Sequence, residues 1–138
     1  RHVNKSPFFE TCETFMAKSR PLSPHLQVYR PQLTSVMSIM HRVTGVILAT
    51  GTMFLAFWLT ALAVGSNLFT LVAAALSHPI GQLVLFGYSL ALVYHSLNGV
   101  RHLSWDLGIG LGIKEVYLTG YLTVGTTVIV TLVLWFVV

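Results

Sequence analysis

The sequence has few charged residues and a single cysteine, and both shortages limit what the chain can be. Charged residues make up 9% of the 138 residues, whereas hydrophobic residues make up 54%. A soluble domain carries about 25% charged residues, so a water-soluble fold of this size could not cover its surface with polar groups. The lone Cys12 excludes an intrachain disulfide and a metal site built on cysteines. The composition therefore predicts a protein whose solvent is lipid.

Long runs of positive charge are also absent, although the formal net charge is +4. The eight Lys and Arg residues are scattered along the chain. A nucleic-acid-binding protein should show a basic patch or stripe. We therefore expect no nucleic-acid partner, and we expect the positive charge to mark one side of a membrane.

Three long segments contain no charged residue at all, namely residues 43–64, 80–100 and 116–138. As helices they would be about 31–35 Å long, enough to cross a hydrocarbon core of roughly 30 Å. A buried core helix could explain one such segment but hardly three in so small a chain. The sequence therefore predicts an all-α membrane protein with three transmembrane helices, at about residues 36–64, 80–104 and 116–138.

The N-terminal part, residues 1–31, differs from the membrane part, residues 32–138. Ser6 and Pro7 are typical of a helix start, and apolar residues then recur at helical spacing until about Lys18. This pattern predicts a short amphipathic helix that lies on the membrane or docks on a soluble partner. The prolines after it favour an extended segment; they are Pro21, Pro24 and Pro31.

The charges outside the spans predict an orientation. The N-terminal part has five basic residues before Arg42, and the second connection carries Arg101 and Lys114 as well as two acidic residues. The first connection, residues 65–79, has no Lys or Arg, and its apolar stretch is too short to span, so we expect it at the membrane surface. The positive-inside rule places the N-terminus and the second connection on the cytoplasmic or matrix side.

A cluster of polar residues marks the entry to the first span. If the helix begins near Gln32, Ser38, His41 and Arg42 fall on one face. A hydroxyl, an imidazole and a guanidinium side by side can bind a carbonyl or a carboxylate. The alternative is an arginine that merely reaches from the helix end toward the interface.

A second cluster lies near the end of the second span. His95 sits inside an apolar segment, where a neutral imidazole needs a partner such as a haem iron or a neighbouring helix. Gly99, one turn away, would leave room for a flat macrocycle. No second histidine lies deep in another span, so a second axial ligand would have to come from another chain. The cluster comprises His95, Asn98, Gly99 and His102, and we expect no ligand role for His2, His25 and His78.

Three motifs carry a resemblance to a known family. They are Ser-Arg-Pro-Leu-Ser-Pro-His-Leu-Gln-Val-Tyr at 19–29, Ser-Ile-Met-His-Arg-Val-Thr-Gly at 38–45, and His-Ser-Leu-Asn-Gly-Val-Arg-His-Leu-Ser-Trp-Asp at 95–106. In order and spacing the chain resembles the cytochrome b560 membrane anchors of succinate dehydrogenase, respiratory complex II. The resemblance covers about residue 20 to the C-terminus.

The resemblance implies a subunit that is not catalytic alone. It implies a three-helix anchor that pairs with a second, small three-helix cytochrome b subunit and shares one haem b with it. The pair would dock a flavoprotein with FAD and an iron–sulfur subunit, and electrons from succinate would reach ubiquinone in the tricarboxylic acid cycle and respiratory chain. It also implies the mitochondrial inner membrane with the N-terminus on the matrix side, or a bacterial inner membrane with the N-terminus in the cytoplasm.

The resemblance also implies roles for five residues. Ser38 and Arg42 correspond to quinone-binding residues, and His95 to the axial ligand of the haem iron. His41 and Arg42 correspond to residues near the haem propionates, and His102 to a second histidine near the cofactor. The chain departs from animal members at positions 40 and 43, where it has Met and Val, so its origin and its quinone stay open.

Two alternative functions follow from the same residues. The chain could anchor a quinol:fumarate reductase, in which the reaction runs in the opposite direction. It could also be a membrane scaffold or small transporter without redox chemistry, and that hypothesis predicts no haem.

Overall fold

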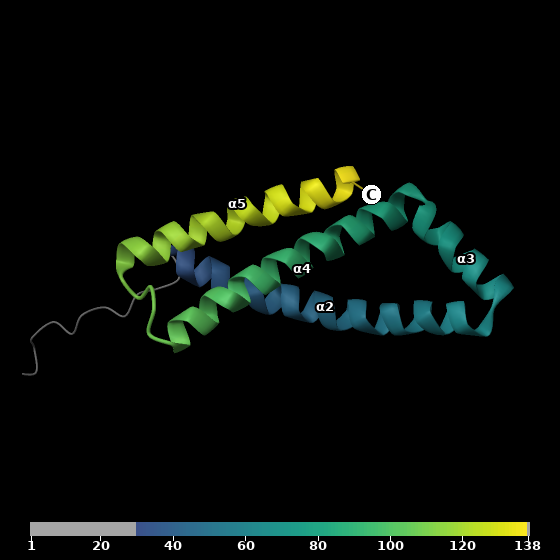
Figure 1. The fold of residues 1–138 in the computed structure, drawn as a ribbon, viewed down its shortest axis with the longest axis horizontal. Helices are drawn as coiled ribbons and strands as arrows, with labels where there is room; N and C mark the ends of the chain where they lie inside the picture. Colours follow the sequence, from purple (N-terminus) through teal and green to yellow (C-terminus); the bar gives the residue numbers. More distant parts are fainter. Residues whose placement is uncertain (1–29, 138) are drawn as a thin grey trace, which may run out of the picture. The chain divides into compact units, whose positions relative to one another are not determined.

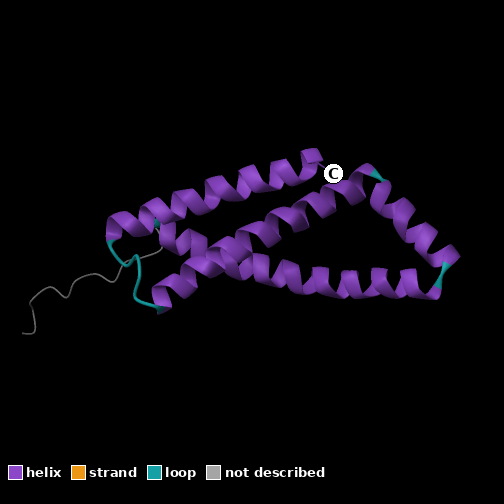
Figure 2. Cartoon of the chain, viewed as in Figure 1, coloured by secondary structure: helices purple, strands orange, loops and turns teal. Residues whose placement is uncertain are grey.

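The computed structural model describes residues 30–137, which form helices and short connections without any strand (Figure 1; Figure 2). The predicted all-α fold is confirmed for this part of the chain. The predicted amphipathic helix through Lys18 and most of the extended segment after it lie outside the described residues. The helices are α2 (Leu33–Val64), α3 (Ser66–Ser77), α4 (Pro79–Asp106) and α5 (Ile113–Val137).

Three of these helices are long and apolar enough to cross a membrane. α2, α4 and α5 contain 32, 28 and 25 residues, and the 18-residue apolar window in each has a mean hydropathy of 2.0, 1.4 and 1.9, respectively. At 1.5 Å per residue they are about 48, 42 and 38 Å long, which exceeds a hydrocarbon core of roughly 30 Å. The prediction of three long apolar helices is confirmed, and each helix begins one to three residues before the start predicted for its span. Helices of this length can extend beyond the hydrocarbon core into the headgroup region.

The first connection contains a helix that the sequence analysis did not predict. α3 is separated from α2 by Gly65, whose φ of +99° is accessible mainly to glycine. α4 then begins at Pro79, and the Nδ1 atom of His78 accepts a hydrogen bond from the N–H of Ile80 at 3.3 Å. Gly81 lies directly against the backbone of Ala75, where a Cβ atom would clash. His78 therefore has a capping role, and α3 folds back closely on the start of α4.

α4 is the central helix of the membrane part. It contacts α2, α3 and α5, and Figure 1 shows it crossing α2. Few large side chains are buried in these contacts, and long rows of apolar side chains on all three spans remain exposed. Exposed apolar side chains are suited to lipid or to another membrane subunit. The buried apolar residues are Met37, Ala61, Val72 and Ala91.

The buried face of α5 consists of small residues. Gly120, Thr123, Thr127 and Thr131 recur at helical spacing and are all buried. The hydroxyls of Thr123 and Thr127 donate to carbonyls one turn earlier in the same helix, at 2.8 and 2.7 Å. This internal bonding lets a polar side chain lie in an apolar medium, and the small side chains allow the helices to approach closely.

Candidate functional site

The contact between α2 and α4 brings three histidine side chains together. The ring of His41 on α2 lies parallel to that of His95 on α4, with centroids 3.9 Å apart and planes 7° apart. His102, two turns further along α4, contacts the His41 ring at a centroid distance of 5.2 Å and an angle of 56°. His41 therefore touches both histidines that the sequence placed on one face of the second span.

One ring nitrogen of His95 is held by α2. Its Nδ1 atom lies 3.1 Å from the main-chain oxygen of His41 and 3.2 Å from Oγ1 of Thr44. Because a carbonyl oxygen only accepts, Nδ1 carries the proton and donates it. The Thr44 hydroxyl donates to the carbonyls of Met40 and His41, at 2.8 and 2.9 Å, so its oxygen can accept from the same Nδ1–H.

This protonation state leaves a lone pair on Nε2 of a neutral His95 ring. No hydrogen bond engages Nε2 in the described part of the chain, and Nε2 is not among the buried polar atoms without partners. Metal-binding histidines are commonly held in this way, with the other ring N–H on a backbone carbonyl. His95 can therefore bind a metal through Nε2.

The three histidines do not form a site for a bare metal ion. Among residues 30–137, no group of His, Cys, Asp or Glu side chains is placed to ligate one. The stacked rings of His41 and His95 are also too close for an iron and its macrocycle to lie between them. A metal on His95 would have to bring most of its ligands with it, as haem iron does.

Two glycines permit this packing. A Cβ atom on Gly45 would lie 3.1 Å from Cε1 of His95, and one on Gly99 would lie 3.9 Å from Cε1 of His41. Gly99 was predicted to leave room for a flat macrocycle, and the space beside it borders the His41 ring. Thr44 and Gly45 also belong to the site, although these residues were not predicted to do so. Their positions three and four residues after His41, on the same helix face, are the signal that could have found them.

Ser38 and Arg42 lie one turn apart on α2, on either side of His41 in the sequence. Ser38 is half-buried and Arg42 is exposed. Neither side chain makes a hydrogen bond or ion pair within the described residues. The Nδ1 atom of His41 is buried without a hydrogen-bond partner, and such an atom calls for one. This turn of α2 can therefore offer polar groups to a ligand.

Asn98 and Arg101 have a different environment from the histidines beside them. Arg101 is 6% exposed, and its Nε and Nη2 atoms donate to Oγ1 of Thr119 and the carbonyl of Val116 on α5, at 3.0 and 2.7 Å. Its Nη1 lies 3.5 Å from Oδ1 of the fully buried Asn98. Arg101 thus lies inside the helix bundle and not in the second connection, so the predicted orientation depends on the basic residues before α2.

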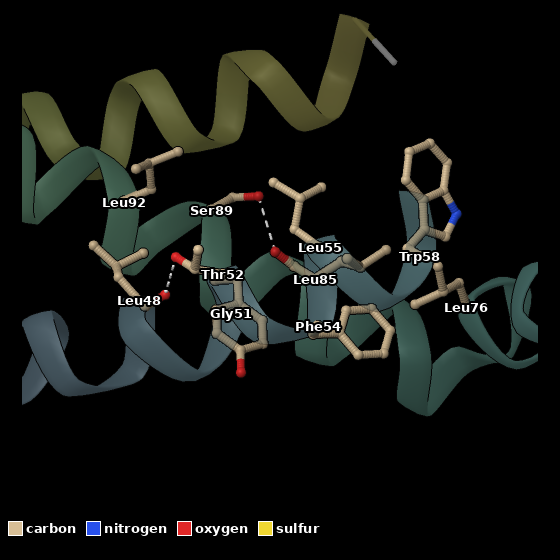
Figure 3. A pocket seen from close by; sticks show the side chains of 11 residues that line it. Leu48, Gly51, Thr52, Phe54, Leu55, Trp58, Leu76, Leu85, Ser89 and Leu92 are labelled. Atoms are coloured by element: carbon tan, nitrogen blue, oxygen red, sulfur yellow. Dashed lines mark hydrogen bonds between the residues drawn. The ribbon is translucent and has the colours of Figure 1, made fainter. Parts of the chain in front are cut away.

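A cavity of about 550 Å³ lies between α2, α3 and α4 (Figure 3). Its lining contains no charged residue, and the hydroxyls of Thr52 and Ser89 donate to carbonyls of their own helices. The cavity is therefore suited to an apolar group. It is lined by Leu48, Gly51, Thr52, Phe54, Leu55, Trp58, Leu76, Leu85, Tyr88, Ser89 and Leu92.

Comparison with known proteins gives a consistent match over most of the chain. The model of the succinate dehydrogenase/fumarate reductase transmembrane subunit family matches residues 16–134. The cytochrome b556 subunit of succinate dehydrogenase from Rickettsia prowazekii is 39% identical over 116 residues, which are 84% of this chain and 90% of the relative.

Two relatives named cytochrome b560 subunits of succinate dehydrogenase extend this match. The one from Reclinomonas americana is 40% identical over 124 residues, with 86% of each chain covered. The one from Marchantia polymorpha is 46% identical over 111 residues, which are 76% of this chain and 80% of the relative. With three helices able to cross a membrane, the chain belongs to the family of succinate dehydrogenase/fumarate reductase transmembrane subunits.

Proposed function

We propose that this chain is the haem b-binding membrane anchor of a succinate:ubiquinone oxidoreductase and helps to form its quinone site. The observation that carries the proposal is the geometry of His95. Its Nδ1–H is fixed on the His41 carbonyl, and its Nε2 is left without a partner inside an apolar helix. The names of the relatives, cytochromes b of succinate dehydrogenase, support the same ligand chemistry.

His95 binds the haem iron through Nε2 in this proposal. The hydrogen bonds from Nδ1 to His41 and Thr44 hold the ring in one tautomer and one orientation. Haem b supplies a one-electron redox centre when it is bound. The small cytochrome b subunit would supply the second ligand of the haem iron, because no second histidine lies deep in another span of this chain.

His41, Arg42 and His102 border the haem in the proposed site. The buried Nδ1 of His41 lacks a partner, and the Arg42 guanidinium has none among the described residues. A propionate group is a carboxylate that could accept from either side chain. His102 touches His41 and limits the movement of its ring.

Ser38 and Arg42 form this chain's part of the quinone site. The hydroxyl of Ser38 can donate a hydrogen bond to a quinone carbonyl, and the positive charge of Arg42 stabilises the negative charge that develops on the oxygen during reduction. Both effects are stronger near an apolar medium than in water. The unpartnered state of both side chains supports this role.

The proposed assembly contains three further subunits. The flavoprotein with FAD oxidises succinate, the iron–sulfur subunit delivers the electrons, and the small cytochrome b subunit completes the haem site. The N-terminus and the α4–α5 connection then face the mitochondrial matrix, or the cytoplasm in a bacterium. This side is where a soluble flavoprotein and its iron–sulfur partner can dock.

The test is a reduced-minus-oxidised optical spectrum of the complete purified complex. We expect a low-spin b-type spectrum that the His95→Ala variant loses or converts to a form that binds carbon monoxide, with flavin and iron–sulfur content unchanged. The His78→Asn variant is a matched control, because asparagine also caps helices and His78 lies at the other end of α4. A complex without b-type haem, or an unchanged low-spin spectrum in His95→Ala, would contradict the proposal.

A further inference from the structure

The last turn of α4 contains a tryptophan with three separate attachments. The ring of Trp105 meets His102 edge-on, with centroids 5.2 Å apart and planes at 86°. The Cζ atom of Arg101 lies 4.1 Å from the centroid of the Trp105 ring. The indole N–H donates to the carbonyl of Gly110 at 3.2 Å. Trp105 therefore joins the end of α4, the α4–α5 connection and the group of histidines.

Arg101 contacts both this tryptophan and α5. Its guanidinium is buried, and the Thr119 hydroxyl and the Val116 carbonyl on α5 accept from it. Its partners within the described residues are all neutral. A buried guanidinium in such a setting is held in place, because every donor that moves loses its acceptor.

These contacts continue as far as the proposed haem ligand. Trp105 touches His102, His102 touches His41, and His41 stacks on His95. Rings in close contact cannot turn independently, because close-packed side chains transmit displacement to their neighbours. A row of contacts thus leads from α5 to the ring of His95, although Trp105 and His95 are ten positions apart.

We propose that Trp105 is a positioning residue for His95. It limits the movement of His102 and, through His41, fixes the rotation of the His95 ring. Arg101 holds Trp105 in place from the side of α5. The inference rests on the proposed haem function, since it concerns the orientation of the ligand that His95 provides.

A purely structural role for Trp105 makes a different prediction. If Trp105 only closes the end of α4 on the connection, its loss affects the stability of the complex but leaves the bound haem unchanged. A positioning role predicts that the bond between His95 and the iron weakens while the complex stays assembled. The two roles therefore differ in haem-specific measurements.

The experiment uses the complete complex with the Trp105→Leu substitution. We measure the rate of haem transfer to apomyoglobin and the fraction of reduced haem that binds carbon monoxide, with subunit content and thermal unfolding recorded beside them. We expect haem loss about tenfold faster than in the wild type, as for other groups that orient metal ligands, together with a carbon monoxide-binding fraction that the wild type lacks.

Trp135→Leu is the matched control. Trp135 lies on α5 and meets Phe86 edge-on at 5.5 Å, outside the row of contacts, so we expect wild-type haem properties. Trp105→Phe keeps a ring near His102 but lacks the indole N–H, and haem loss about threefold faster is expected for one lost hydrogen bond. If Trp105→Leu does not assemble, Trp105→Phe decides the question.

The inference is overturned if haem loss and carbon monoxide binding in the deciding variant equal those of the wild type, or if Trp135→Leu changes them equally. A wild-type complex without a b-type spectrum would instead overturn the proposed function. The two failures are therefore distinguishable.

Discussion

The His41 ring lies parallel to the His95 ring at a centroid distance of 3.9 Å, while the main-chain oxygen of His41 accepts the Nδ1–H of His95 at 3.1 Å. One residue of α2 thus holds the His95 ring both by its face and by its edge. A ring restrained twice keeps its Nε2 lone pair in a fixed direction. Four predictions follow from the geometry around this pair and from the packing of the spans.

Thr44→Val should weaken haem binding about fivefold. Valine has the shape of threonine but cannot accept the Nδ1–H of His95, and one hydrogen bond is worth about 1 kcal/mol. Haem transfer from the purified complex to apomyoglobin measures the effect. Thr52→Val is the control, because Thr52 is exposed and bonds only to a carbonyl of its own helix. Equal rates for the two variants would contradict a role for Thr44.

Gly45→Leu should abolish the low-spin haem spectrum, and Gly45→Ala should have a smaller effect. The first Cβ atom would already lie 3.1 Å from Cε1 of His95, so a larger side chain must displace the imidazole. Optical spectra of the variant complexes test this. Gly87→Leu is the control, because a Cβ atom at Gly87 would meet no other helix of the described residues within 4 Å. A normal spectrum in Gly45→Leu would show that the ring tolerates displacement.

Arg42→Ala should lower succinate-to-quinone activity by about tenfold or more and leave succinate-to-dye activity unchanged. The substitution removes a positive charge that would stabilise the reduced quinone oxygen, and such interactions are worth several kcal/mol. The ratio of the two activities in one preparation is the measurement. Lys114→Ala controls for the loss of an exposed charge at another helix end. Equal loss of both activities would mean damage to assembly and would count against a quinone role.

Gly120→Val should destabilise the packing of α5 by about 1–3 kcal/mol. A Cβ atom there would lie 2.9 Å from Cδ2 of Leu33 and 3.1 Å from Sδ of Met37, both on α2. Thermal unfolding of the complex in detergent would show a lower midpoint. Gly125→Val is the control, since no atom of another helix in residues 30–137 lies within 4 Å of the Gly125 Cβ position. A shift as large in that variant would point to a general cost of valine in α5.

The fold was predictable from the sequence because the spans are defined by composition alone. A run of uncharged residues that is long enough to cross the bilayer can be recognised without knowing which segments pack against it. α3 escaped prediction because its twelve mostly apolar or small residues, Ser66–Ser77, are too few to span a membrane and fit an interfacial loop as well as a helix. The close approach of α3 to α4 at Gly81 is a tertiary feature that the segment alone does not reveal.

The site was predictable only as separate helix faces. Helical spacing put His95 and His102 on one face of α4 and Ser38, His41 and Arg42 on one face of α2. The contact of His41 with both α4 histidines depends on where α2 and α4 cross. The position of that crossing cannot be predicted from a single sequence. The roles of the residues in haem and quinone binding remain predictions.

The burial of Arg101 was likewise not predictable from its own segment of the sequence. A basic residue near the end of a span resembles a flanking charge of a connection. Its burial depends on the Val116 carbonyl and the Thr119 hydroxyl, which belong to the next helix. Acceptors on a neighbouring helix are invisible to an analysis of one segment at a time.

The acceptor for the Nδ1–H of His95 belongs to the main chain, and every amino acid at position 41 would provide the same oxygen. Exchanging the side chain at that position therefore removes the stacked ring and keeps the anchoring bond. A series of substitutions at position 41 would therefore measure the contribution of the His41 side chain alone. The side chain can vary while the main-chain hydrogen bond to His95 is kept.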